Sequence, residues 1–222
     1  MPAYGEHAIT LASFEQIDRE VGTHAFTKAE YAVVRRVIHT TADFEFKQLM
    51  RFSHQPFEAV GQALRTGQPI VTDVSMVAAG IGSVVAKTWN APVTVAVQQV
   101  SQKPLIQQCS QSQIQTDQTS QYQTRSAMGM RQCAQANPEA IFAIGNAPTA
   151  LLALCEGIER GDWRPALVIG APVGFINVVE SKQALANMSV PHILVSGRKG
   201  GSAVAAAILN ALMIWAWEQQ NE

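Results

Sequence analysis

Five short apolar runs alternate along the chain with segments whose apolar residues recur at helical spacing. Continuous apolar runs of this length are typical of parallel strands that are buried on both faces, because helices cover each side of the sheet. We therefore predict a single three-layer α/β domain over residues 1–222, with a mainly parallel five-stranded sheet. The predicted strands are Pro69–Thr72, Val93–Val97, Ile141–Ile144, Ala166–Ile169 and His192–Val195.

The last three predicted strands each end in a tight turn that contains glycine. Right-handed crossovers place the turns that follow parallel strands on the same edge of the sheet. Ligands of open α/β sheets bind at this edge, so these turns are the first candidates for a functional site. They comprise Gly145–Pro148, Gly170–Gly174 and Gly197–Ser202.

Capping residues predict where the helices begin and end. Ser13 is predicted as an N-cap, with Gln16 completing a capping box and Gly22 ending the helix. Thr27 and Glu30 form a second capping box, which opens the next helix. Further helices are predicted over about residues 56–65 and 125–136 and from Gly201 and Ser202 onward.

Residues 98–123 form a segment rich in glutamine, serine and threonine. Polar low-complexity sequence of this kind buries too little apolar surface to hold itself rigid. We expect a loop or insertion here that is mobile when no ligand is bound.

Composition narrows the classes of partner. The net charge of -1 and the absence of a basic block argue against nucleic acid. Cys109, Cys133 and Cys155 show neither disulfide-framework nor zinc-site spacing, so no metal site is expected.

The first ten residues lack the charged and apolar segments of a secretory signal. The apolar stretch Ala203–Trp217 is too short to span a bilayer and is expected to be a buried helix or a dimer face. We expect a cytoplasmic protein without a membrane partner.

The turn Gly197–Ser202 has the features of an anion site. Arg198 and Lys199 precede a helix N-terminus, and Gly200, Gly201 and Ser202 allow backbone N–H groups to approach a ligand. The alternative is an ordinary turn with two solvated basic residues. Asn146 has a comparable place in an earlier turn, where it also suits a purely structural helix cap.

His39 and Arg125 are the other side chains with chemical potential. His39 lies near the C-terminal end of its predicted helix, where the helix dipole favours a protonated imidazole suited to general acid catalysis. The alternative is a histidine that only caps carbonyl groups at the end of the helix. Arg125 and Ser126 open a helix after the glutamine-rich segment, so Arg125 is able to reach the same sheet edge.

Several blocks together resemble the precorrin-8X methylmutase family of cobalamin biosynthesis. The resemblance covers nearly the whole chain, with the glutamine-rich segment matching least. The blocks are IHTTAD (38–43), PIVTDVSMV (69–77), TRSA (124–127), AIGNAPTALL (143–152), GAPVGFINVVESK (170–182) and GRKGGSAVAAAILNAL (197–212).

The resemblance implies a homodimeric flavodoxin-like fold and an intramolecular methyl shift. The methyl group moves from C-11 to C-12 of precorrin-8X or cobalt-precorrin-8 and gives hydrogenobyrinic or cobyrinic acid, without an organic cofactor. The family's acid histidine matches His39, the arginine of its TRS motif matches Arg125, and its N-terminal serine matches Ser13. The substrate is a tetrapyrrole with many carboxylates, which Arg125, Arg198, Lys199 and turn N–H groups are expected to hold.

Two alternatives stay open at the level of sequence. A nucleotide-binding enzyme would use the Gly197–Ser202 turn, although GxGxxG and Walker-type fingerprints are missing. A carrier protein would keep the tetrapyrrole pocket without the reaction.

Overall fold

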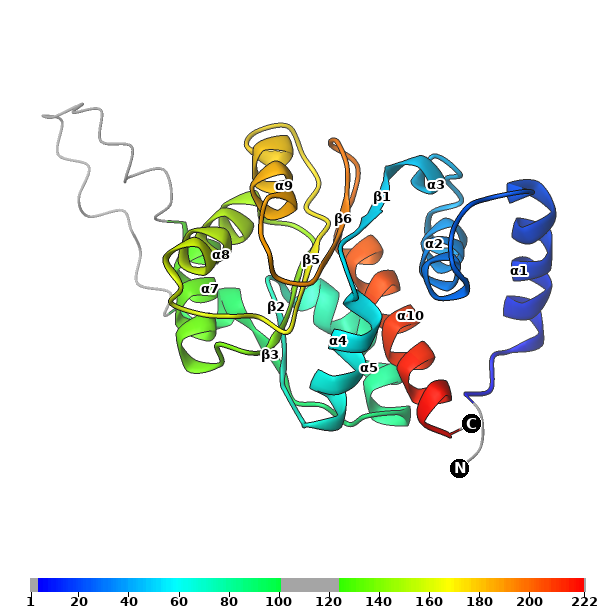
Figure 1. Cartoon of the computed structure of the whole chain (residues 1–222), viewed down its shortest axis with the longest axis horizontal. Coiled ribbons are helices and arrows are strands. Elements are labelled where there is room, and N and C mark those ends of the chain that lie inside the picture. Colours follow the sequence, from blue (N-terminus) through cyan, green and yellow to red (C-terminus); the bar gives the residue numbers. More distant parts are fainter. Residues whose placement is uncertain (1–3, 101–123, 222) are drawn as a thin grey trace, which may run out of the picture.

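The computed structural model describes residues 4–100 and 124–221, and these residues form an α/β fold around one six-stranded sheet (Figure 1). The strand order is β1-β6-β5-β4-β2-β3. Strands β2 to β6 are parallel, whereas β1 pairs with β6 in the antiparallel direction. The strands are β1 Met50–Phe52, β2 Ile70–Thr72, β3 Val93–Val95, β4 Ile141–Ile144, β5 Leu167–Gly170 and β6 His192–Val195.

The five predicted strands are all present, but the prediction of a five-stranded sheet was wrong because β1 was missed. This strand has only 3 residues, too few to show a periodic pattern, and a short helix directly precedes it. The strand predicted over Val93–Val97 ends at Val95, and the chain then enters helix α6. The first glutamines of the segment 98–123 are therefore helical, and residues 101–123 lie outside the described residues.

Helices cover both faces of the sheet. Helices α4, α5 and α10 pack on one face, with α2 against α10 and α1 outermost, while α7, α8 and α9 lie on the other face (Figure 1). Among the described residues, no helix is long and apolar enough to cross a membrane. The helices are α1 Ala8–Val21, α2 Lys28–Thr41, α3 Phe46–Leu49, α4 Pro56–Arg65, α5 Ser75–Lys87, α6 Ala96–Gln99, α7 Arg125–Ala136, α8 Pro148–Arg160, α9 Val178–Ala186 and α10 Ser202–Asn221.

Side chains of the central strands belong to two separate apolar clusters, one on each face of the sheet. In β4, Ile141 and Ala143 belong to the cluster with α10, whereas Phe142 and Ile144 belong to the cluster with α7 and α8. All four side chains are fully buried. This alternation follows from the period of two in a strand, and it explains why the sequence shows a continuous apolar run.

The capping predictions for the first two helices had different outcomes. The Thr27 capping box is confirmed, since Thr27 N–H donates to Glu30 Oε2 at 2.8 Å and Glu30 N–H donates to Thr27 Oγ1 at 3.3 Å. Gly22 ends α1, as predicted. The N-cap at Ser13 was wrong, because α1 begins earlier with His7 as its cap. The Ser13 hydroxyl instead donates to the carbonyl of Ile9 at 2.8 Å within the helix.

A buried carboxylate at the end of β2 fixes the turn that follows β4. Asp73 is fully buried and accepts hydrogen bonds from the N–H groups of Gly145 at 3.0 Å, Asn146 at 2.8 Å and Ala147 at 2.8 Å. Burial raises the pKa of Asp73, while these backbone N–H donors act in the opposite direction. The side chain thus satisfies the N–H groups that precede α8, which otherwise lack partners inside the helix.

We expect Asp73→Asn to lower the free energy of unfolding by about 1–3 kcal/mol. The amide keeps one acceptor oxygen and turns an NH₂ group toward backbone N–H donors. Urea unfolding measures the effect, with Asp162→Asn as the control because Asp162 forms an exposed ion pair with Arg160. Equal effects of the two substitutions would contradict the anchoring role of Asp73.

Candidate functional site

The turns after β4, β5 and β6 meet at one edge of the sheet, as predicted. Gly201 N–H donates to the carbonyl of Ala171 at 2.8 Å, which joins the turn after β6 to the turn after β5. A Cβ atom at Gly145 would lie 2.7 Å from Ser202 Cα, so the turn after β4 lies directly against the start of α10. The turns therefore form one connected assembly.

The turn over residues 197–202 needs glycine at Gly200. Its φ of +154° lies in the region that L side chains rarely adopt, and a Cβ atom there would lie 2.3 Å from the carbonyl oxygen of Ala171. Backbone of the two turns therefore packs at a distance that only glycine allows.

A buried lysine that was not among the predicted site residues donates hydrogen bonds to this turn. Lys182 of α9 is buried, and its ammonium donates to the carbonyls of Gly197 at 2.8 Å and Lys199 at 2.7 Å. Burial lowers the pKa of Lys182 to about 8. The signal was available, since Lys182 lies with Val178 and Leu185 on the buried stripe of α9, where a lysine is unexpected.

The two basic residues of the turn have different surroundings. The Lys199 ammonium pairs with Asp43 at 2.5 Å and with Glu45 at 2.6 Å. The hydrogen bond from Lys199 lowers the pKa of Asp43, and these two carboxylates raise the pKa of Lys199. Arg198 is exposed, with its guanidinium 5.7 Å from the centre of the Phe175 ring. The expected anion donors therefore differ, because the charge of Lys199 is already balanced within the chain.

The ion pairs of Lys199 bring the end of α2 to the sheet edge. His39 lies in the last turn of this helix, as predicted, and Ala42 caps the helix in a left-handed conformation. The His39 side chain is exposed and meets the Phe14 ring edge-on, with the ring centres 5.3 Å apart.

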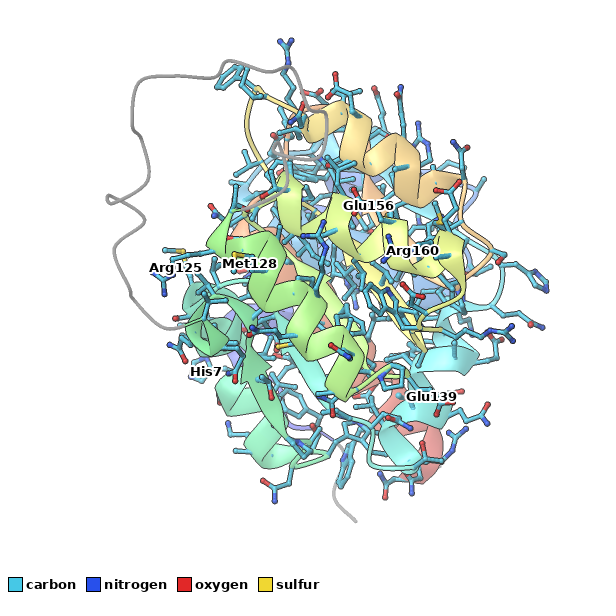
Figure 2. The ribbon with its side chains drawn as sticks, turned by 90° about the vertical axis from the view of Figure 1, so that its left-hand side faces the viewer. His7, Arg125, Met128, Glu139, Glu156 and Arg160 are labelled. Atoms are coloured by element: carbon cyan, nitrogen blue, oxygen red, sulfur yellow. The ribbon has the colours of Figure 1, made fainter. Side chains whose placement is uncertain are left out.

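Arg125 lies at the start of α7, beside the carboxyl end of β3. Its Nη2 donates to the carbonyl of Val97 at 2.9 Å, and its Nε is buried without a hydrogen-bond partner among the described residues. Figure 2 shows Arg125 and Met128 near each other at the N-terminal end of α7. Ser126 follows in the same turn and is half-buried. The structure thus places Arg125 and Ser126 at the predicted edge, with part of the guanidinium committed to the backbone.

Asn146 and Ser13 are less closely connected with the other predicted side chains. The N–H of Asn146 is committed to Asp73, while the residue itself is exposed. Ser13 is half-buried in α1, next to Phe14, and its hydroxyl bonds within its own helix. Phe14, the next residue in the sequence, contacts His39. Ser13 therefore lies one residue away from a contact with the end of α2.

Large apolar side chains are exposed in the segments that follow the strands at this edge. Phe175 is 81% exposed, Ile176 79% and Met76 70%. Met128 of α7 and Phe44, which lies between α2 and α3, are also exposed. An edge that combines cations, backbone donors and exposed apolar side chains suits a large ligand with both apolar surface and negative charges.

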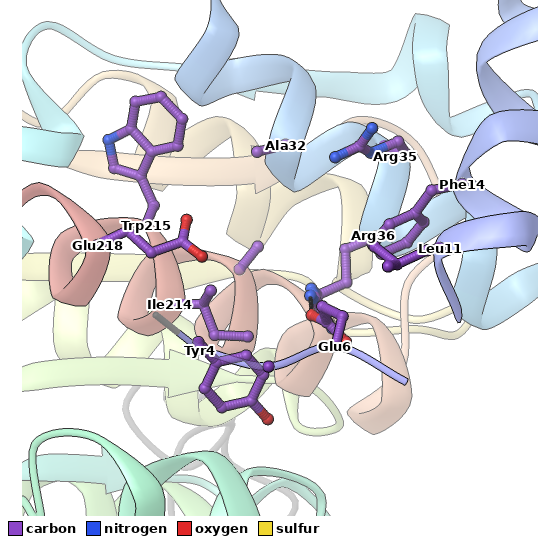
Figure 3. A pocket seen from close by; sticks show the side chains of 12 residues that line it. Tyr4, Glu6, Leu11, Phe14, Ala32, Arg35, Arg36, Ile214, Trp215 and Glu218 are labelled. Carbon is purple, nitrogen blue, oxygen red and sulfur yellow. Dashed lines mark hydrogen bonds and ion pairs between the residues drawn. The ribbon is translucent and has the colours of Figure 1, made fainter. Parts of the chain in front are cut away.

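A cavity of about 410 Å³ lies away from the turns, between α1, α2 and α10 (Figure 3). Phe14, Arg35, Arg36 and Trp215 contribute to its wall, and Arg36 forms an ion pair with Glu6. His39 is not part of its lining. The candidate site is therefore the sheet edge rather than this cavity.

Lys182 makes stability depend on pH in a defined window. Because burial lowers its pKa from 10.5 to about 8, the folded chain binds fewer protons than the unfolded chain between these values. Stability rises with pH wherever the unfolded state binds more protons. This lysine therefore lowers the free energy of unfolding below pH 8, and the cost is relieved as the pH rises through the window.

We expect wild type to gain on the order of 1 kcal/mol of stability relative to Lys182→Met between about pH 8 and pH 10. Methionine cannot titrate, and other ionisable groups cancel in the difference. Urea unfolding at several pH values measures it, and Lys87→Met, at the exposed end of α5, should follow wild type. A difference that stays constant with pH would show that the pKa of Lys182 is not lowered.

Comparisons with known proteins identify the chain. The family model for precorrin-8X methylmutase matches residues 8–215. The cobalt-precorrin-8 methylmutase of Synechocystis sp. is 45% identical, over 96% of this chain and 98% of the relative. The precorrin-8X methylmutase of Sinorhizobium sp. is 34% identical, over 93% of both chains.

A solved structure gives the same result. The crystal structure of precorrin-8X methylmutase from Thermus thermophilus superimposes with a TM-score of 0.80 at 38% identity, over 96% of this chain and 99% of that one. The chain belongs to the precorrin-8X methylmutase family, the isomerases that transfer a methyl group within their substrate in cobalamin biosynthesis.

Proposed function

We propose that the sheet edge binds the tetrapyrrole and that the methyl group moves there from C-11 to C-12. The observation that carries this proposal is the pairing of Lys199 with Asp43 and Glu45, which ties the end of α2 to the turn after β6. This pairing joins the segment that begins four residues after His39 to the turn that contains Arg198, although the two are far apart in sequence. The family assignment replaces the alternative of a nucleotide-binding enzyme.

Binding of the substrate uses two kinds of contact. Arg198 and the available N–H groups of the 197–202 turn hold carboxylates, and Arg125 contributes at the β3 end of the edge. Exposed apolar side chains such as Phe175 and Ile176 cover the flat macrocycle. A chain with a net charge of -1 recognises a polyanion only through such local donors.

The chemistry requires an electronic bias on the ring rather than a nucleophile. His39 supplies it by donating a proton to the macrocycle, while the edge holds the ring in one geometry. Because substrate and product are isomers, the proton leaves again after the migration and no group is consumed. General acid catalysis contributes about 10²–10⁴-fold, so this step is the principal chemical contribution of the protein.

Strand order and exposed surface support two further parts of the proposal. The parallel strands follow the order β3-β2-β4-β5-β6, which is the flavodoxin-like order 2-1-3-4-5. The exposed apolar residues at the edge are compatible with a homodimer whose second copy helps to enclose the substrate. The roles of Ser13, Ser126 and Asn146 and the cytoplasmic location stay predictions from the sequence.

An absorption time course distinguishes an enzyme from the alternative of a carrier protein. The purified chain is mixed with precorrin-8X and, separately, with cobalt-precorrin-8. We expect conversion to the corrin chromophore, and faster conversion of the cobalt form, because the relative at 45% identity is named for that substrate. A spectrum that shifts on mixing and then stays constant for both forms would establish a carrier.

We expect His39→Ala to lower kcat by about 10²–10⁴-fold while substrate binding persists. His54→Ala is the matched control, since His54 is an exposed histidine between β1 and α4, outside the proposed site. Single-turnover absorption measures the chemical step, and titration of the spectrum measures binding. Near-normal turnover by the His39 variant would exclude its role as the acid.

A further inference from the structure

The hydrogen bonds from Lys182 to two carbonyls determine the direction of the N–H groups that share a peptide with those carbonyls. In a trans peptide group the C=O and N–H point in opposite directions. The carbonyl of Gly197 shares its peptide with the N–H of Arg198, and the carbonyl of Lys199 shares its peptide with the N–H of Gly200. Since both carbonyls face Lys182, both N–H groups point away from it, to the outer side of the turn.

These two N–H groups are available to a ligand. Gly201 N–H is committed to Ala171, and the carbonyl of Arg198 accepts from Gly174 N–H at 3.4 Å. Within residues 4–100 and 124–221, the N–H groups of Arg198 and Gly200 donate to no protein acceptor. They lie just before α10, a helix of 20 residues whose dipole adds positive potential.

The stability of the chain alone does not account for Lys182. A buried ammonium is costly unless it is paired, and among the described residues Lys182 has no carboxylate partner. Both of its hydrogen bonds go to one turn, on either side of Arg198. Its charge also polarises these two peptide groups, which strengthens their outward N–H donors.

We propose that Lys182 is a positioning residue that shapes a carboxylate subsite from the N–H groups of Arg198 and Gly200 and the Arg198 guanidinium. In this proposal the buried ammonium acts on the substrate through the turn, because its two hydrogen bonds go to the carbonyls of Gly197 and Lys199. The inference rests on the proposed function for the substrate and assigns one of its carboxylates to this turn.

The kinetic test compares Lys182→Met with Lys87→Met. Loss of the subsite should raise KM about tenfold or more, with a smaller effect on kcat, whereas a merely structural role would reduce the active fraction and leave KM unchanged. Lys182→Arg, which keeps the charge and the donors, should recover part of the loss. An unchanged KM in folded Lys182→Met overturns the proposal and leaves the proposed function standing.

A second measurement does not depend on turnover. Propionate, a short carboxylate probe, is titrated while the amide resonances of Arg198 and Gly200 are followed by NMR. We expect saturable shifts in wild type and Lys87→Met that are lost in Lys182→Met. If wild type binds propionate in this way but converts no tetrapyrrole, the subsite stands and the proposed function fails.

Two results of the titration would overturn the subsite. One is the absence of shifts at these amides in wild type, and the other is an unchanged response in Lys182→Met. Circular dichroism checks the fold of each variant. If the methionine variant does not fold, Lys182→Gln carries the same comparison, because glutamine is shorter, uncharged and unable to span both carbonyls.

Discussion

Within the part of the chain that the structure describes, two buried charged groups near the carboxyl edge of the sheet are satisfied by backbone groups rather than by counter-ions, and the turns after β4 and β6 depend on them. Asp73 accepts the N–H groups of the turn after β4, whereas Lys182 donates to carbonyls of the turn after β6. The negative and the positive charge have opposite consequences for the turns they contact. A carboxylate uses up N–H donors and makes its turn structural, whereas an ammonium uses up acceptors and leaves N–H donors facing outward.

Local patterns predicted much of this architecture, and the failures have physical reasons. The apolar runs located the parallel strands because helices bury both faces, and Thr27 with Glu30 located the start of α2 because a capping box is a contact between neighbours in sequence. The strand β1 is stabilised by pairing with β6, a contact distant in sequence. Ser13 had the residue type of a cap, but the ring of His7 made the cap instead.

The candidate site was predictable only where its chemistry lies within one turn. Arg198 and its glycines were evident from their spacing. That Lys199 is paired with Asp43 and Glu45 was not, because this contact joins segments at opposite ends of the chain. Lys182 shows a third situation, since its place on the buried stripe of α9 was visible in the sequence, but its partners were not.

The ion pairs of Lys199 also affect which groups of the edge are available to a negatively charged ligand. With that ammonium balanced by two carboxylates, the net cationic character of the turn comes from Arg198, the buried Lys182 and oriented peptide groups. Oriented donors cost no reorganisation when charge arrives, whereas a flexible lysine would lose side-chain entropy on binding. The pairing uses Lys199 to hold the segment after α2 against the turn. Under the proposed function, the polyanion is then recognised by the exposed Arg198 together with peptide N–H groups whose geometry the fold already sets.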